Sequence, residues 1–548
     1  MEKIENTIEI NKNENNNENI LTNTNLDTNL NPEKSNINQN GQTEENSKSL
    51  QNSQVVQNQK TKEKGKGKLK DNNIFRYSII AFSILVMIFF RFIPTGSLSQ
   101  SGMAVIGVFL GTLLLWLTIS IYWPSILCIL FLGTIDGLTF KSLFMSSFGS
   151  DTFVFLLCTF ICTYALSTTN IIKKISVWFI TNKLSRKGAW WFVVMYTFSI
   201  ILLGMFISPS VLFVVLLPIL NEIYNKCNIE KGSKLGAMLM MILAFSVSIS
   251  SGMTPIAHVF PIISLGIYEN LTGLTISYAK YMLLAIPVGL ISSILMLVIF
   301  RFVLRPDMSK LKSENLSEIE NLEKLNKRDI AILVIFICMV LLWIVPSLLQ
   351  NILPGVYKTI NGFGTAFPAL IGVVVMSILK VEDKPLVSIG EACKKGVPFS
   401  SLIMCAGTLA LSTAITNDAI GIKLFLVNNM SSLLSGFSPI LLLIIFALWA
   451  MIQTNVSSNM VTATLVTTIA VPILQSINAG FILPATVVVI GMLSAFAFAT
   501  PPSMPHIAIA ASSEYANTKC VFVYGTILAM ISVIVSVCVC YGLGILIF

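Results

Sequence analysis

Residues 453–459 read Gln-Thr-Asn-Val-Ser-Ser-Asn, and they interrupt an apolar segment that extends over about 438–478. A second apolar segment, 189–225, is interrupted in the same way by Ser208-Pro209-Ser210. A helix that crosses a membrane needs about 20 mainly apolar residues in a row, and neither segment offers such a run on both sides of its break. Each segment is therefore predicted to form a hairpin that enters the membrane and returns to its own side.

The composition shows that water is not the main solvent of this chain. Of its residues, 54% are hydrophobic and only 11% are charged, with a mean hydropathy of +0.78, whereas an ordinary soluble domain carries about 25% charged residues. Residues 1–73 are rich in Asn and Lys and are predicted to be a disordered cytoplasmic tail. The net charge of +9 is attributed to cationic cytoplasmic loops and not to nucleic-acid binding.

Eleven further apolar stretches are candidate crossings of a hydrocarbon layer roughly 30 Å thick. We therefore predict an all-α polytopic membrane protein with about 11 transmembrane helices and two re-entrant hairpins. The predicted crossings are 74–93, 102–120, 122–135, 152–170, 235–251, 278–304, 329–348, 364–380, 399–416, 482–499 and 520–548.

The basic residues set a topology for these crossings. With the N-terminus in the cytoplasm, the predicted inner loops carry 20 Lys and Arg residues and the outer ends carry five. This asymmetry is typical of membrane proteins and predicts a multi-pass protein of the plasma or inner membrane, in which hairpin 189–225 is an inner hairpin and 438–478 an outer one. The predicted inner loops are 171–188, 221–234, 301–328, 380–396 and 513–519.

The polar linker 305–328 divides the membrane region into two halves, 74–304 (crossings 1–6) and 329–548 (crossings 7–11), with the same features in the same order. Each half has a hairpin with a polar tip, then an apolar helix that contains a Pro, then a helix broken by a polar step, at 250–255 or at 499–502. An odd number of crossings separates the two copies. We therefore predict an inverted repeat with a transport site near the middle of the membrane.

The four breaks favour the binding of ions. Backbone that is not helical at membrane depth leaves N–H and C=O groups without partners, so it survives only against protein or a polar cavity. A helix that begins at a hairpin tip directs its free N–H groups at the site, which suits a carboxylate. Free carbonyls and Ser, Thr and Asn oxygens suit Na⁺. Because no Lys, Arg, Asp or Glu lies near a break, we expect co-bound cations to neutralise an anionic substrate.

Two histidines follow the broken steps at a distance of a few residues, and they are the only ones in the chain. His258 and His506 are predicted either to gate the pathway in a pH-dependent way or to serve as hydrogen-bonded structural residues. The chain has no HExxH motif, so no metal site other than one for Na⁺ is expected. No Ser/His or Asp/Asp pair lies within the crossings, and the chain is therefore not expected to be an enzyme.

In these features the chain resembles the divalent anion:sodium symporter family, which includes di- and tricarboxylate and sulfate carriers, over roughly residues 75–548. Family members carry a Ser-Asn-Thr motif at each hairpin tip. Here the first reads Ser208-Pro209-Ser210 and the second Ser458-Asn459-Met460, with an alternative register at Thr462-Ala463-Thr464. The family motif Ala-Thr-Pro-Pro-Asn is matched by residues 499–503, which read Ala-Thr-Pro-Pro-Ser.

The resemblance implies a homodimer with a scaffold domain and a transport domain that moves as an elevator. The resemblance also implies that the protein needs no cofactor beyond Na⁺ as the coupling ion. The implied partners are a small anion and membrane lipid. The implied Na⁺ site residues, with their neighbours, are Ser208, Ser251, Gly252, Ser458, Asn459 and Ala499. The implied substrate residues are Ser210, Thr254, Asn459, Thr462, Thr500 and Pro501.

The function predicted is secondary active transport of small anions, as Na⁺-coupled symport of a succinate-like di- or tricarboxylate. The alternatives are a Na⁺-independent anion exchanger and a Na⁺/H⁺ antiporter of the same superfamily. A sensor that binds the anion without moving it is a third alternative. The sodium dependence of uptake separates these functions.

Overall fold

A computed structural model of the chain describes residues 73–93, 98–256, 258–311, 325–349, 352–422, 425, 436–501 and 503–548. These residues are helical, apart from turns and one antiparallel two-stranded ribbon, β1 (Lys380–Val381) with β2 (Lys384–Pro385). The predicted all-α class is confirmed. The predicted tail up to residue 72 and residues 312–324 of the predicted linker lie outside the described part.

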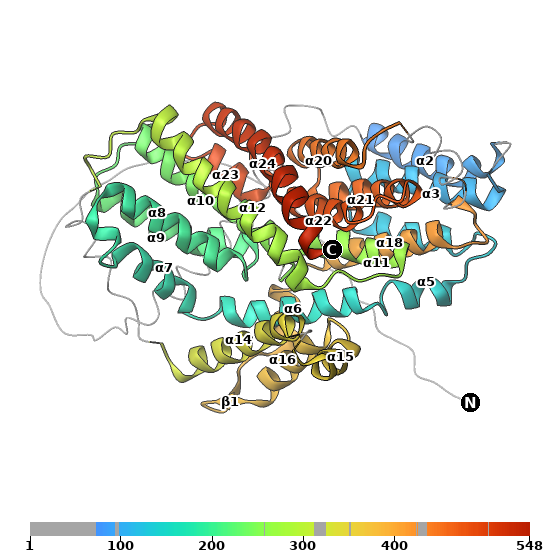
Figure 1. Cartoon of the computed structure of the whole chain (residues 1–548), viewed down its shortest axis with the longest axis horizontal. Helices are drawn as coiled ribbons and strands as arrows, with labels where there is room; N and C mark the ends of the chain where they lie inside the picture. Colours follow the sequence, from blue (N-terminus) through green and yellow to red (C-terminus); the bar gives the residue numbers. More distant parts are fainter. Residues whose placement is uncertain are drawn as a thin grey trace, which may run out of the picture. The chain divides into compact units, whose positions relative to one another are not determined.

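The first half of the chain contains the helices that run from α2 to α12 in Figure 1, with three short helical turns, η1, η2 and η3. They are α2 (Asn73–Phe89), η1 (Phe90–Phe92), α3 (Gln100–Thr118), α4 (Trp123–Leu132), α5 (Phe140–Ser146), α6 (Asp151–Ser167), α7 (Ile171–Thr181), η2 (Ser185–Lys187), α8 (Ala189–Gly204), α9 (Pro209–Lys226), α10 (Lys234–Met253), α11 (Val259–Thr272), α12 (Tyr278–Ile299) and the π-helical turn η3 (Phe300–Leu304).

The second half repeats much of this order. Its helices are α14 (Lys327–Leu348), α15 (Pro354–Gly362), α16 (Phe367–Ile378), α17 (Ile389–Lys395), α18 (Phe399–Thr416), α20 (Pro439–Val456), α21 (Asn459–Ser476), α22 (Ile482–Leu493), α23 (Pro505–Ala511) and α24 (Thr518–Ile547), with the β1–β2 ribbon between α16 and α17.

Nine helices of the described residues are long and apolar enough to cross a membrane, or ten if the bent pair of α5 and α6 counts as one span. Every predicted crossing coincides with a helix, but α4, α16 and α22 have only 10, 12 and 12 residues. The number of crossings therefore stays a prediction. Two of the predicted inner loops contain short helices, because α7 lies within 171–188 and α17 lies within 380–396. Helix α7 forms there because one side of it is apolar and buried.

Each segment predicted as a hairpin is a pair of helices, α8 with α9 and α20 with α21, and that each pair returns to its own side of the membrane stays a prediction. Helices α9 and α21 have the same length, 18 residues. Each is followed by an Asn in the left-handed conformation, Asn228 with φ 48° and Asn478 with φ 51°, a conformation that Asn tolerates better than most residues. The two hairpins are therefore alike in the length of the second helix and in how it ends.

The halves pack into each other. Helix α11 of the first half packs against α21 and α22 of the second, and α23 of the second packs against α9 and α10 of the first. A hydrogen bond of 3.0 Å from Thr467 Oγ1 to Ser264 Oγ joins α21 to α11. The short helices that follow the breaks are thus held by the opposite half of the chain.

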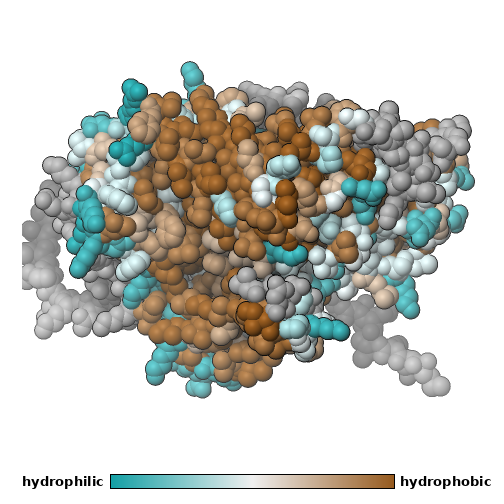
Figure 2. Space-filling view, viewed as in Figure 1, coloured by the Kyte–Doolittle hydropathy of each residue, from teal (hydrophilic) through white to brown (hydrophobic). Residues whose placement is uncertain are grey.

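The outer face over α12 and α24 is apolar. Figure 2 shows hydrophobic side chains over these two helices, with hydrophilic ones gathered toward the margins. Ile294 on α12 and Ile534 on α24 are 60% and 62% exposed. Apolar side chains this exposed over a whole face are expected where lipid replaces water as the solvent.

Candidate functional site

The N-termini of the two hairpin helices α9 and α21 are not capped by a side chain. The N-cap residues are Ser208 and Ser458, and neither hydroxyl accepts a hydrogen bond from the first turn of its helix. Serine is a strongly preferred N-cap because its oxygen satisfies one of the free N–H groups there. In the described residues, every other helix with a Ser at its N-cap makes this hydrogen bond. These helices are α3, α6, α10, α12, α17 and α20.

The second hairpin tip also holds an amide without a partner. Asn459, the first residue of α21, is 4% exposed, and both its Oδ1 and its Nδ2 lack a hydrogen bond. The buried Ser457 Oγ beside it lacks one as well. A buried polar group without a partner costs about 1–3 kcal/mol. Three such atoms at one helix start are expected where the missing partner is a ligand.

The broken segment that follows α22 is held by a different Asn. Residues 494–501, 503 and 504 are not helical, so their backbone groups need partners from elsewhere. Asn455 Oδ1 accepts hydrogen bonds of 2.8 Å from the N–H groups of Phe498 and Ala499. Its Nδ2 donates to Met451 O at 2.9 Å. Asn455 thus acts as a clamp between α20 and the break.

Three hydroxyls satisfy carbonyls around the same break. Thr454 Oγ1 donates to Ser494 O at 2.6 Å, and Ser248 Oγ donates to Ala497 O at 3.0 Å. Thr500 Oγ1 donates to the backbone carbonyl of Asn455. Since Ser248 belongs to α10, both halves of the chain hold this break in place.

The first break, of which residues 254–256 and 258 are described, is shorter and packs against the first hairpin tip. Thr254 Oγ1 donates to Met205 O, and His258 Nε2 lies 2.8 Å from Gly204 O. A Cβ atom at Gly204 would collide with Ser250 on α10, so the close approach requires glycine. Met205 lies three residues before Ser208, as Asn455 lies three before Ser458, so Thr254 and Thr500 make the same contact in the two halves.

Between the halves, α10 and the second break meet closely. A Cβ atom at Gly252 would lie 2.7 Å from Met492 O, and the carbonyl of Gly252 accepts a 2.8 Å hydrogen bond from Tyr281 OH. His506 is fully buried, and its Nε2 lies 2.8 Å from Ser248 Oγ. Both histidines therefore have hydrogen-bond partners, and their predicted gating role stays a prediction.

The predicted site residues fall into three groups. Ser251, Gly252, Thr254, Ala499, Thr500 and Pro501 lie at the two breaks, and Ser208, Ser458 and Asn459 lie at the two tips. Thr462 lies inside α21, where its hydroxyl donates to Ser458 O at 3.1 Å, so the tip has the register of Ser458-Asn459 and not that of Thr462. Ser210 is exposed in the first turn of α9, away from these hydrogen bonds.

Sequence analysis did not assign a role to Asn455, Thr454 or Ser248. The signal was present for Asn455, because an amide inside an apolar helix marks a functional or structural site in a membrane protein. Ser248 gave no signal, because its partners Ala497 and His506 are about 250 residues away in the sequence.

The site carries no fixed charge. The segments 204–210, 250–258, 454–464 and 494–506 contain no Lys, Arg, Asp or Glu. What they offer is the positive end of α21, the negative ends of α20 and α22, and the free amide of Asn459. Such a set can hold an anion next to a cation.

Comparison with known proteins agrees with this arrangement. The family model described as sodium:sulfate symporter transmembrane region matches residues 72–548. The chain belongs to this family. The predicted family of divalent anion:sodium symporters is thereby confirmed, and the chain is a multi-pass membrane transporter and not an enzyme.

Two relatives of this chain are identical to it at about a quarter of the aligned positions. The sodium-dependent dicarboxylate transporter SdcS of Staphylococcus saprophyticus is 23% identical, over 82% of this chain and 87% of the relative. SdcS of Staphylococcus aureus is 26% identical, over 72% and 76%. The solved structure of the YdaH transporter of Alcanivorax borkumensis matches with a TM-score of 0.49 at 12% identity, over 74% of this chain and 88% of that one.

Proposed function

We propose that this protein is a Na⁺-coupled symporter of small di- or tricarboxylates, with succinate as the representative substrate. The buried, unpartnered amide of Asn459 at the uncapped start of α21 carries the proposal. The names of the SdcS relatives, which are sodium-dependent dicarboxylate transporters, support both the substrate class and the coupling ion.

On this proposal the substrate carboxylate accepts hydrogen bonds from the free N–H groups of α21 and from Asn459 Nδ2. Na⁺ binds on the other side of the tip, where Asn459 Oδ1, Ser457 Oγ and carbonyls at the end of α20 supply oxygen ligands. Half-helix ends of opposite polarity that meet near the membrane midplane are suited to this pairing of an anion with a cation. Without a fixed charge, the site cannot neutralise a dianion unless Na⁺ binds with it.

We assign a corresponding site for Na⁺ and substrate, with weaker binding, to the first hairpin tip. Ser208, Ser251 and Gly252 lie on its Na⁺ side, and Ser210 and Thr254 on its substrate side, while Ala499, Thr500 and Pro501 complete the second site. The two halves form an inverted repeat, and the hairpins move together as an elevator within a homodimer. The N-terminus is assigned to the cytoplasm, and the excess of Lys and Arg in the predicted inner loops supports this orientation.

Uptake of radiolabelled succinate into proteoliposomes tests the proposal, with and without an inward Na⁺ gradient. Wild type is compared with Asn459→Ala and with Gln475→Ala. Gln475 Oε1 is another buried, unpaired amide oxygen, at the far end of the same helix, so it is a matched control. We expect uptake to require Na⁺, to fall at least about tenfold in Asn459→Ala, which is the effect of losing about 1.4 kcal/mol of binding, and to persist in Gln475→Ala.

Other outcomes identify the alternatives. Succinate flux that ignores Na⁺ and needs an anion inside the vesicle would make the protein an exchanger. Proton movement driven by Na⁺ without any anion would make it a Na⁺/H⁺ antiporter. Binding of succinate without flux would indicate a sensor. Equal loss of uptake in both variants would remove Asn459 from the site.

A further inference from the structure

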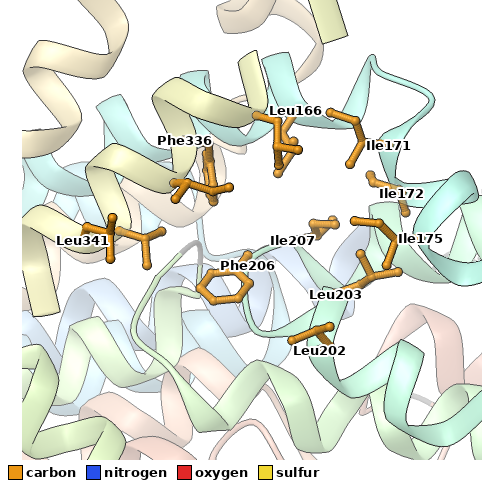
Figure 3. A pocket seen from close by; sticks show the side chains of 13 residues that line it. Leu166, Ile171, Ile172, Ile175, Leu202, Leu203, Phe206, Ile207, Phe336 and Leu341 are labelled. Carbon is orange, nitrogen blue, oxygen red and sulfur yellow. The ribbon is translucent and has the colours of Figure 1, made fainter. Parts of the chain in front are cut away.

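An apolar cavity of about 220 Å³ lies beside the first hairpin tip. Figure 3 shows side chains of α7 and α14 that converge on it from opposite sides, above Phe206 and Ile207 in the turn between α8 and α9. All thirteen lining residues are Leu, Ile, Phe or Val. No group in the wall can form a hydrogen bond with its side chain, so the cavity does not suit the anion that the protein transports.

The cavity is continuous with the surface that faces lipid. Two of its lining residues on α14, Ile337 and Leu341, are themselves 47% and 49% exposed, and Val334 on the same helix is 52% exposed. A narrow hydrocarbon chain can therefore enter from the side. The volume is below the roughly 300–1,000 Å³ that is typical of sites for compact small molecules, which also favours a chain over a bulky ligand.

Basic residues lie next to the lining segments of α7 and at the start of α14. On α7, Lys173 and Lys174 lie between the lining residues Ile172 and Ile175. Helix α14 begins at Lys327 and reaches its first lining residue, Leu333, six residues later, a rise of about 9 Å. The starts of the two helices lie together.

A hydrogen bond shows this proximity. Arg328 Nη2 donates at 2.9 Å to Thr168 Oγ1, in the turn just before α7. The nearby acidic side chain on α14, Asp329, is 2% exposed and so presents little negative charge at the surface. Trp178 of α7 is 61% exposed, as is typical of Trp at the level of lipid headgroups.

We propose that the cavity between α7, α8 and α14 binds one acyl chain of an anionic phospholipid, whose headgroup is held by Lys173, Lys174 and Lys327. Apolar contact supplies binding along the chain, and each basic residue at the surface favours an anionic headgroup over a zwitterionic one, by roughly fivefold. The ring of Phe206 packs edge-on against that of Phe336 on α14, with centroids 6.4 Å apart. The lipid would therefore touch the hairpin tip directly.

The molecule offers a matched control cavity. A second apolar cavity of about 220 Å³ is lined by residues of α3, α18 and α21, including Ile106 and Ile469. None of these three helices contains Lys or Arg. Lys423, which follows the lining residue Ile422, lies outside the described residues. Lipid at this second cavity is expected to show no strong preference for a negative headgroup.

Photolabelling in proteoliposomes tests the proposal by a readout that does not depend on transport. The probes are phosphatidylglycerol and phosphatidylcholine, each with a diazirine in its acyl chain, and labelled peptides are mapped by mass spectrometry. We expect phosphatidylglycerol to label 202–207 and 333–341 at least about fivefold more than phosphatidylcholine does. The triple variant Lys173→Gln/Lys174→Gln/Lys327→Gln should abolish this difference.

The second part of the experiment fills the cavity with a larger side chain. Ile337→Trp, at the exposed mouth, should reduce labelling of 202–207 severalfold, whereas Ile106→Trp in the control cavity should leave it unchanged. Elution as a single species on size exclusion serves as the control for folding. Equal labelling by the two lipids in wild type, or labelling that ignores Ile337→Trp, would overturn the proposal and leave only ordinary solvation by lipid.

Discussion

The two hairpins of this transporter make the same turn but support very different amounts of irregular backbone. The first break, residues 254–258, follows a helix that continues to Met253. The second begins where α22 ends at Leu493 and extends to residue 504. The longer break leaves more N–H and C=O groups without helical partners. The second hairpin has Asn455 at the position where the first has Met205, and Asn455 accepts hydrogen bonds from two of these N–H groups.

The hairpin tips also differ, because the second tip offers more hydrogen-bonding groups than the first. Pro209 begins α9 and so removes one N–H donor, while its ring offers no ligand. Asn459 begins α21 and supplies a donor and an acceptor that no protein group uses. This comparison supports the proposal that the second hairpin supplies most of the ligands, while the first mainly completes the fold around it.

The largest effect is expected from exchanging the residues that differ between the hairpins. Asn455→Met should destabilise the protein by about 2–6 kcal/mol, because two backbone N–H groups lose their partners at about 1–3 kcal/mol each. The temperature at which half the protein leaves the monodisperse peak on size exclusion measures this. The reciprocal variant Met205→Asn should shift that temperature far less. Similar shifts in both variants would erase the difference between the halves.

A smaller effect of opposite sign is expected at Asn459. Because its amide has no protein partner, Asn459→Leu should keep or raise thermal stability, by at most about 1–3 kcal/mol, while succinate uptake is lost. A marked fall in the unfolding temperature would show that Asn459 supports the structure and not a ligand. Asn455→Met, which is expected to unfold at lower temperature, is the contrasting control.

The first tip should gain function if it is made more like the second. Pro209→Asn restores one N–H donor and adds an amide, so we expect the apparent affinity for Na⁺ to rise about fivefold, the effect of one net hydrogen bond of about 1 kcal/mol. The Na⁺ dependence of succinate uptake measures it, with Pro209→Ala as the control that restores only the N–H. An unchanged affinity in both variants would mean that the first tip takes no part in Na⁺ binding.

The smallest expected effect tests what the halves share. Thr254→Val and Thr500→Val each remove one hydrogen bond from a break to a hairpin carbonyl, at Met205 and at Asn455. Each should cost about 1 kcal/mol of stability, and the two costs should agree. If the two variants lower the unfolding temperature by different amounts, the shared contact contributes differently to stability in the two halves.

The sequence was enough to predict the membrane class, the family and the positions of both hairpins and both breaks. These features depend on local signals, namely apolar runs, Ser and Pro at a break, and motif order. The clamp at Asn455 and the bond from Ser248 to Ala497 depend on contacts between distant segments, which periodicity does not report. The lack of a cap at Ser208 and Ser458 could not be predicted either, because the residue type alone favours a cap.

The two halves reach the equivalent contacts of Thr254 and Thr500 with different spacings along the chain. From Ser208 to Thr254 is 46 residues, and from Ser458 to Thr500 is 42. The connector before α10 is longer than that before α22, and it forms exposed ion pairs of 2.7 Å from Lys310 to Glu230 and 2.6 Å from Lys231 to Glu514. Two of the four extra residues lie in the connector, which has seven residues (227–233) before α10 and five (477–481) before α22, and the other two lie between the start of the helix and the threonine. Neither connector is helical, so its length does not set the direction of Thr254 about the axis of α10. An insertion in the exposed connector should therefore be tolerated, whereas one residue inserted within α10 would turn Thr254 by about 100° away from Met205.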